Sequence, residues 1–201
     1  MLQHVRPAVV LLVLFSALTG LVYPLAVTGI AQIAMPRQAN GSLIEKDGAV
    51  IGSALIGQNF KTDRYFHPRP SATTEPDPKD PSKTIDDPYN AAGSGGSNLG
   101  PTSKTLVDRV KAGVEAWRAM ASPGPVPADA VTTSASGLDP DVSPSTALAQ
   151  VASIAKARGL PEDRVRALVE SSIEGRALGL IGEPRVNILR LNLALDQLKS
   201  S

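Results

Sequence analysis

Apolar residues are concentrated near the N-terminus, in a run from Pro7 to Pro36 that contains no charged side chain. A helix of this length exceeds the roughly 20 residues that cross the hydrocarbon core of a bilayer. Arg6 and Arg37 bracket the run, where they would meet water and lipid headgroups. The pattern predicts one transmembrane helix, in which Pro24 removes a backbone hydrogen bond and can introduce a kink.

A cleaved signal peptide is the alternative interpretation of this run. Its apolar region usually has only about 7–15 residues, which Leu11–Leu18 could supply, with Gly29-Ile30-Ala31 as the cleavage site. The apolar character continues to Met35, which favours a retained helix. Because a long C-terminal part translocates largely regardless of its charge, we expect a cytoplasmic N-terminus and an extracytoplasmic domain.

The positions that follow the helix predict a β-containing half. Leu43–Glu45 and Ala49–Ile51 flank Lys46-Asp47-Gly48, and Asp-Gly between apolar runs is a strong hairpin signal. From Pro68 to Pro88, prolines and charged residues leave no face to bury. We expect this stretch to be an exposed loop, extended or partly disordered.

Apolar residues recur at spacings of three and four after residue 100, which predicts a helix. One helix face would be formed by Leu106, Val107, Val110, Val114 and Trp117. We expect Pro101 or Thr102 in its first turn, and the run Ser122–Pro127 to end it.

The C-terminal half has the end signals of further helices. Ser143-Pro144 predicts a helix start, with an apolar face that ends at Gly159. Pro161-Glu162 predicts the start of a second helix, and Glu183-Pro184 that of a last one.

Together these elements predict a single N-terminal transmembrane helix followed by a mixed α/β (α+β) soluble domain. The helix and a short cytoplasmic head would occupy residues 1–36. A β-containing lobe would span 37–121, and a helical lobe 122–201.

Composition excludes several classes of function. A net charge of +1, with 19% charged and 3% aromatic residues, provides neither a basic stripe nor stacking rings for nucleic acid. Cysteine is absent, which excludes disulfides, thiolate metal sites and a cysteine nucleophile. The only histidines, His4 and His67, leave little for a zinc site, so we expect no metal.

Glycines gather in Gly93–Thr102, just before the first predicted helix of the domain. Such a loop can present backbone N–H groups to a phosphate. Gly95 and Gly100 have the separation of the GxxxxGK[ST] pattern, but Pro101 replaces its lysine and no apolar strand precedes the loop. Packing against its own chain or a partner, and nucleotide contact by another geometry, both stay open.

Three further groups could carry chemistry. Ser153–Lys156 matches S-x-x-K without its partner motifs, and a serine–histidine–acid triad would have to use His67 without a G-x-S-x-G elbow. Asp139 and Asp141 could bind a cation, but aspartate before proline and serine is ordinary turn chemistry. We favour structural roles for all of them. A membrane-anchored extracytoplasmic hydrolase or binding protein is the alternative function.

Within the apolar run, small and polar residues suit close packing on another membrane helix. The candidates are Thr19, Gly20, Tyr23, Pro24 and Gly29. The run holds no carboxylate or lysine, so an ion path through this helix alone is unsupported.

An ordered series of short motifs covers nearly the whole chain. It comprises Leu18–Leu25, Ala39–Ile44, Gly52–Gln58, Tyr65-Phe66, Arg69–Ala72, Tyr89-Asn90, Ser94–Thr102, Asp129–Pro140, Gly182–Asn187 and Asn192–Asp196. Together these motifs resemble the C-subunit family of bacterial Kdp potassium-transporting P-type ATPases. Ser103, where the family pattern has asparagine, and the long loop between Ala72 and Tyr89 depart from it.

The resemblance implies a non-catalytic, single-pass subunit of the bacterial inner membrane. Its implied partners are a potassium-channel-like subunit, a P-type ATPase subunit and membrane lipid, with potassium as the transported ion and no firmly bound cofactor. One implied role is a catalytic chaperone that raises the ATP affinity of the pump subunit. An extracytoplasmic domain conflicts with that role and favours a cap over the external potassium path. The residues expected to contact nucleotide or partner are Gln58, Ser94, Gly95, Gly96, Ser97, Asn98, Gly100 and Thr102.

Overall fold

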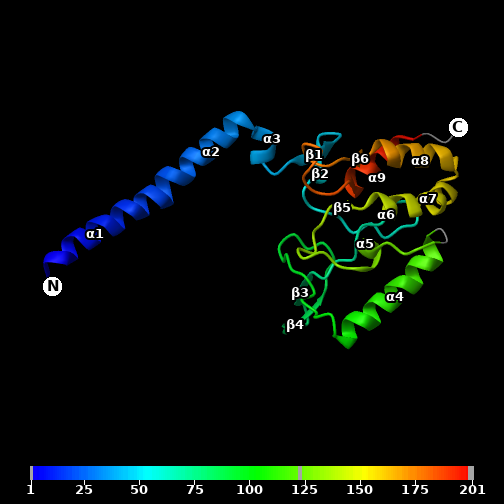
Figure 1. Cartoon of the computed structure of the whole chain (residues 1–201), viewed down its shortest axis with the longest axis horizontal. Helices are drawn as coiled ribbons and strands as arrows, with labels where there is room; N and C mark the ends of the chain where they lie inside the picture. Colours follow the sequence, from blue (N-terminus) through cyan, green and yellow to red (C-terminus); the bar gives the residue numbers. More distant parts are fainter. Residues whose placement is uncertain (1, 122–123, 199–201) are drawn as a thin grey trace. The chain divides into compact units, whose positions relative to one another are not determined.

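The chain forms two compact units in the computed structural model, which describes residues 2–121 and 124–198 (Figure 1). One unit ends at Ser53 and the other begins at Ala54. An N-terminal apolar helix precedes a mixed α/β part with strands first and helices later, which confirms the predicted fold class.

The three-part division at 1–36, 37–121 and 122–201 stays a prediction. Ser122 and Pro123, where a helix end and a lobe boundary were expected, lie outside the described residues.

The apolar run forms one continuous helical segment. α1 (Leu2–Ala17) and α2 (Tyr23–Ala34) are joined by a π-helical turn, Leu18–Val22. In a regular α-helix, the ring of Pro24 would clash with the carbonyl four residues earlier. The π turn relieves this clash, since the N–H of Tyr23 donates to the carbonyl of Leu18, five residues back.

This segment is the one helix in the described part of the chain that is long and apolar enough to cross a membrane. Gln3–Ala34 spans 32 residues, has a mean hydropathy of 2.3 and buries none of its surface. The short helix α3 (Pro36–Ala39) follows it. Beside α3, the side-chain amides of Gln32 and Asn40 donate to each other at 3.0 and 3.2 Å.

The predicted hairpin after the helix is confirmed. β1 (Leu43–Lys46) pairs antiparallel with β2 (Ala49–Ser53). Asp47 and Gly48 connect them with positive φ values of 53° and 79°, as a two-residue type I′ turn requires.

A second hairpin occupies the proline-rich stretch. β3 (Thr74–Asp77) pairs with β4 (Asp80–Asp86), so the expectation of an irregular loop is wrong here, although most of these side chains are exposed as expected. The turn is held locally, because the carboxylate of Asp77 accepts the N–H of Lys79 at 2.8 Å. Each strand of a two-stranded sheet has an unpaired side, which is where proline is tolerated.

The first helix of the domain, α4 (Lys104–Met120), begins later than expected. Ser103 is its N-cap, with its hydroxyl accepting the N–H of Leu106 at 3.4 Å, and Pro101 and Thr102 precede the helix. Trp117 is buried as predicted, whereas Val107 is 42% exposed because only a narrow stripe of the helix packs on the domain.

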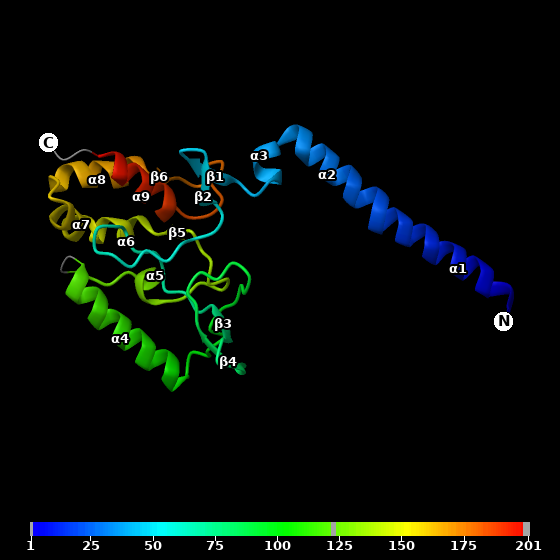
Figure 2. The same ribbon diagram turned by 180° about the vertical axis from the view of Figure 1, so that it is seen from behind.

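The rest of the chain supplies the core elements. They are α5 (Ala128–Val131), β5 (Asp141–Val142), α6 (Pro144–Ala149), α7 (Val151–Arg158), α8 (Glu162–Ser171), β6 (Ile173–Glu174), β7 (Arg185–Asn187) and α9 (Ile188–Gln197). The strands form an antiparallel sheet in the order β5-β7-β6. Figure 2 shows α6 to α9 gathered beside this sheet, and α4 running from β4 toward α7.

Two of the predicted helices differ in their boundaries. The helix between Ser143 and Gly159 is interrupted at Gln150, which separates α6 from α7. The last helix begins at Ile188 rather than Pro184, because β7 pairs with both neighbouring strands first. The cap at Ser143 and the left-handed end at Gly159 (φ 66°) are confirmed.

The core of the second unit lies among α6 to α9 and includes one residue from an extended segment, Phe66. Asn192 and Gln150, both 1% exposed, hold this segment through their side-chain amides. Asn192 accepts the N–H of Phe66 at 2.8 Å and donates to its carbonyl at 3.0 Å. Gln150 does the same for His67, at 2.7 and 3.2 Å. The segment thereby gains backbone partners without joining a sheet.

Asn192→Ala should lower the free energy of unfolding by about 2–4 kcal/mol, since it leaves two buried backbone groups of Phe66 without partners. Chemical denaturation of the full chain in detergent, followed by the fluorescence of its single tryptophan, Trp117, measures this. Gln197→Ala, at an exposed position of the same helix, is the control and should change it by less than about 0.5 kcal/mol. A similar effect of both substitutions would contradict the role of Asn192.

Candidate functional site

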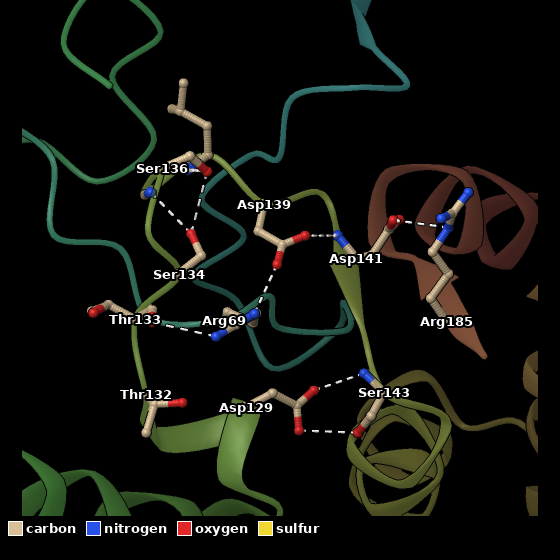
Figure 3. A network of polar contacts seen from close by, with 12 residues as sticks. Arg69, Asp129, Thr132, Thr133, Ser134, Ser136, Asp139, Asp141, Ser143 and Arg185 are labelled. Carbon is tan, nitrogen blue, oxygen red and sulfur yellow. Dashed lines mark hydrogen bonds and ion pairs between the residues drawn. The ribbon is translucent and has the colours of Figure 1, made fainter. Parts of the chain in front are cut away.

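The residues predicted to contact nucleotide or partner converge on one irregular segment, Thr132–Pro140, here called the serine-rich segment (Figure 3). Its Ser136 carbonyl accepts the N–H of Gly95 at 2.9 Å and the hydroxyl of Ser94 at 3.1 Å. Two residues further on, the Leu138 carbonyl accepts the N–H of Gly57 at 2.9 Å. The structure thus attaches the glycine-rich loop and the residue before Gln58 to the same scaffold.

Glycine is required in this scaffold because backbone lies directly on backbone. A Cβ on Gly96 would lie 2.8 Å from the carbonyl oxygen of Ala135, and one on Gly137 (φ +67°) would lie 2.7 Å from that of Gly95. No heavy atom lies within 4 Å of a Cβ built on Gly95. The glycines therefore permit close packing within the chain.

The remaining loop residues lead away from the serine-rich segment toward α4. The hydroxyls of Ser97 and Thr133 are 3.5 Å apart, Asn98 has a positive φ of 51°, and the carbonyl of Gly100 accepts the N–H of Ser103. Thr102 is exposed. The loop ends before the N-cap of α4, so its glycines do not form the N-terminal turn of that helix.

Gln58 is half-buried, next to a residue with no room for a side chain. A Cβ on Gly57 would lie 2.3 Å from the ring of Tyr89 and 2.7 Å from the carbonyl oxygen of Asp139. The carbonyl of Gln58 accepts the N–H of Phe60 at 3.1 Å.

An arginine fixes the serine-rich segment from the extended segment that holds Phe66. Nη1 of Arg69 donates to Asp139 at 2.8 Å, and Nη2 donates to the carbonyl of Thr133 at 3.3 Å (Figure 3). The other carboxylate oxygen of Asp139 accepts the N–H of Asp141 at 3.1 Å. This contact confirms the turn interpretation of Asp139. Among the described residues, no cluster of three or more acidic or histidine side chains could hold a metal.

Tyr89 and Ser71 complete the scaffold, and the sequence analysis assigned neither of them a role. The hydroxyl of Tyr89 donates to the carbonyl of Arg69 at 2.8 Å, and burial raises the pKa of that hydroxyl. The hydroxyl of Ser71 donates to Gly137 at 2.8 Å and accepts the N–H of Tyr89 at 3.1 Å. The positive φ of Tyr89, 67°, is a tertiary constraint without a sequence signal, since a bulky residue rarely adopts it.

A second polar cluster follows at the start of α6. Asp129 accepts the N–H of Ser143 at 2.7 Å and the hydroxyl of Thr146 at 2.6 Å. Asp141 accepts from Asn187 at 3.1 Å and pairs with Arg185 at 3.1 Å. Burial raises the pKa of Asp141, against the opposing effects of Arg185 and Asn187. These carboxylates are engaged in capping and ion pairing.

The two residues considered for nucleophilic catalysis line one cavity of about 730 Å³ between α7 and the end of α4. Asp63, His67, Ser153 and Lys156 are among its walls. Ser153 donates its only hydroxyl proton to the carbonyl of Gln150 at 2.9 Å. His67 Nε2 is buried without a hydrogen-bond partner, and burial lowers the pKa of His67, with Asp63 acting in the opposite sense.

The candidate packing residues of the apolar helix are exposed. No heavy atom comes within 4 Å of a Cβ built on Gly20 or Gly29, so backbone is open to a neighbouring helix there. Thr19 donates its hydroxyl to the carbonyl of Phe15 at 2.7 Å, and Tyr23 is 66% exposed. Pro24 follows directly after the π turn.

Fold and site together define a class of protein: a single-helix membrane protein whose α+β domain carries a tightly packed glycine-rich loop. A family model described as "K+-transporting ATPase, c chain" matches residues 5–197. The chain therefore belongs to the KdpC family.

Curated relatives agree with this assignment over almost the whole chain. The "Potassium-transporting ATPase KdpC subunit" of Methylobacterium nodulans is 66% identical over 198 residues, 98% of each chain. Its counterpart in Bradyrhizobium diazoefficiens is 64% identical over 197 residues, again 98% of each chain. That of Rhodopseudomonas palustris is 62% identical over 199 residues, 99% of this chain and 100% of the relative. The resemblance found in the sequence motifs is confirmed.

Gly96→Ala should lower the free energy of unfolding by about 1–3 kcal/mol, because the new methyl group meets the rigid backbone of Ala135. Gly95→Ala, one residue away, is the matched control and should be neutral or slightly stabilising, since no atom lies within 4 Å of its Cβ. Denaturation monitored through Trp117 compares them. Equal destabilisation would contradict the backbone packing described for this loop.

Protonation of His67 should destabilise the domain. Because burial lowers its pKa below the ordinary value of 6.5, the folded state binds fewer protons than the unfolded state just below that pH. Stability is therefore complete above pH 6.5 and declines as the pH falls toward the lower folded pKa, by no more than about 1.4 kcal/mol per pH unit. His67→Leu should remove this contribution. Parallel pH profiles for both proteins would refute it.

Proposed function

We propose that the chain is a non-catalytic accessory subunit of a potassium-transporting ATPase complex. Its relatives are named as such subunits, and its one long apolar helix offers open backbone at Gly20 and Gly29 for packing on other membrane helices. We expect its partners to be a potassium-channel-like subunit and a P-type ATPase subunit. Potassium is then the transported ion, and the chain itself needs no firmly bound cofactor.

Within the complex, we favour a cap over the external mouth of the potassium path. The observation that carries this proposal is the use of the glycine-rich loop. Gly95 donates its N–H to Ser136, and Gly96 lies against the backbone of Ala135. Groups engaged within the chain cannot also cradle a phosphate. The loop instead presents a rigid surface, with Ser94, Asn98 and Thr102 exposed toward a partner.

The cap requires the domain to lie outside the inner membrane, with the N-terminus in the cytoplasm. The short N-terminal head with its single arginine, Arg6, supports this orientation. ATP is scarce on the outer side, which further favours a structural role for the loop.

A catalytic chaperone that raises ATP affinity is the second candidate role. In its favour, the Ser136 and Leu138 carbonyls hold Gly95 and Gly57 within a few residues of each other, so Gln58 and Ser94–Ser97 could approach one ligand. This role requires a cytoplasmic domain.

A membrane-anchored hydrolase has less support. Ser153 and His67 line the same cavity, but the Ser153 hydroxyl proton is donated to a main-chain carbonyl instead of a base.

Single cysteines test the orientation in a chain that has none. Thr102→Cys and Gln3→Cys, both at exposed positions on opposite sides of the apolar helix in sequence, are expressed in cells that lack the native chain. Intact cells are then treated with a membrane-impermeant thiol reagent. We expect Thr102→Cys to be labelled at once, and Gln3→Cys only after the inner membrane is opened.

Restored high-affinity potassium uptake shows that each variant is functional, and uptake that persists without any chain would argue against the subunit role. Protection of Thr102→Cys until the membrane is opened would overturn the cap and support the ATP-related role. Immediate labelling of both cysteines would contradict a membrane-spanning helix.

A further inference from the structure

A small apolar surface stands out on the loop between β6 and β7. Leu178, Leu180 and Ile181 are 91%, 81% and 67% exposed, the highest values among the large apolar side chains from Ala54 onward in the described residues. Together these three side chains are called the apolar knob. Exposure of a contiguous apolar group of this kind usually marks a contact surface.

The loop that carries the knob is rigid. The N–H of Ala177 and the N–H of Ile181 each donate to the other residue's carbonyl, at 2.9 and 3.0 Å, and Leu180 donates to Ala177 at 3.1 Å. The N–H of Gly179 donates to the carbonyl of Arg176 at 3.0 Å. With these donors paired internally, the tip can enter an apolar environment without orphaning them, and little conformational freedom is lost on binding.

Leu178 is unfavourable in the free domain on two separate grounds. Its φ of 53° lies in the left-handed region, where asparagine or glycine is at ease and leucine is not. Its side chain is also almost fully exposed. A leucine that is both strained and solvated fits a position retained for contact with another molecule.

The charges around the loop indicate what that molecule is. Arg176 pairs with Glu183 at 2.7 Å, Arg185 with Glu174 at 3.1 Å, and Arg190 with Glu174 at 2.9 Å. These arginines are already neutralised, whereas loops that enter a bilayer present free cations to lipid headgroups. The loop also lacks the tryptophan and tyrosine residues that anchor segments at a membrane interface. The chemistry therefore favours a protein surface over lipid.

We propose that the apolar knob docks into an apolar socket on another subunit of the transport complex. This inference rests on the proposed function, because only an accessory subunit has such a partner. A few well-buried anchors at the centre of an interface generally carry most of its affinity.

The test measures the affinity of the full-length chain in detergent for a complex purified without it. The double variant Leu178→Asn, Leu180→Gln should bind at least tenfold more weakly. Asparagine suits the left-handed backbone at position 178, so the fold is retained, which an unchanged unfolding midpoint verifies. Val107→Gln, which removes an apolar side chain 42% exposed on α4, is the matched control and should bind normally.

The outcomes separate this inference from the proposed function. Failure of the wild-type chain to bind the complex would refute the accessory-subunit function itself. Normal wild-type binding together with unchanged binding of the double variant would overturn the knob alone. Equal weakening by Val107→Gln would also overturn it, since the loss would not belong to this loop.

An environment-sensitive fluorophore on Leu180→Cys identifies the occupant. In vesicles, its emission should shift to the blue only when the other subunits are present. A shift for the chain alone would overturn the proposal: if it is independent of protein density the tip is in the bilayer or on its own chain, and if it rises with density the occupant is a second copy. No shift even in the complex would overturn it as well.

Discussion

Two buried carboxamides are the constraint on which the second unit depends. An extended segment without a strand partner enters the core at Phe66, and its backbone would be unsatisfied there without Asn192 and Gln150. The interruption between α6 and α7 falls at Gln150 itself, which turns its amide onto the segment. From this fixed point Arg69 reaches Asp139 and Thr133, and so holds the serine-rich segment in place.

The serine-rich segment then organises the surface that the sequence motifs had marked. Its carbonyls receive the N–H groups of Gly57 and Gly95, and its backbone contacts Gly96 without any intervening side chain. Polar groups that could have served catalysis, such as Asp129 and Ser153, are engaged in caps and turns. A subunit of this construction acts through the shape of its surface, which is consistent with its membership of the KdpC family.

Local patterns predicted the elements whose signals are contained in a few neighbouring residues. The uncharged run gave the apolar helix, Asp47-Gly48 gave the type I′ hairpin, and Ser143 and Gly159 gave helix ends. The β3–β4 hairpin was missed because strand formation was judged by burial, while this hairpin is exposed and held by its own turn. The start of the last helix was misplaced because pairing of β7 with β5 and β6 overrides the proline signal at Pro184.

By itself, the sequence determined the membrane segment, the order of strands and helices, and the family, because these depend on hydrophobic length, short-range spacing and ordered motifs. Only the tertiary structure decided what the glycines are for: Gly96 is needed where Ala135, far along the chain, comes within contact distance, and Gly95 is not. It also decided which polar side chains are free and which exposed leucines are strained, as Leu178 is. Such properties arise from contacts between distant residues, and no local pattern encodes the identity of the partner that folding brings into contact.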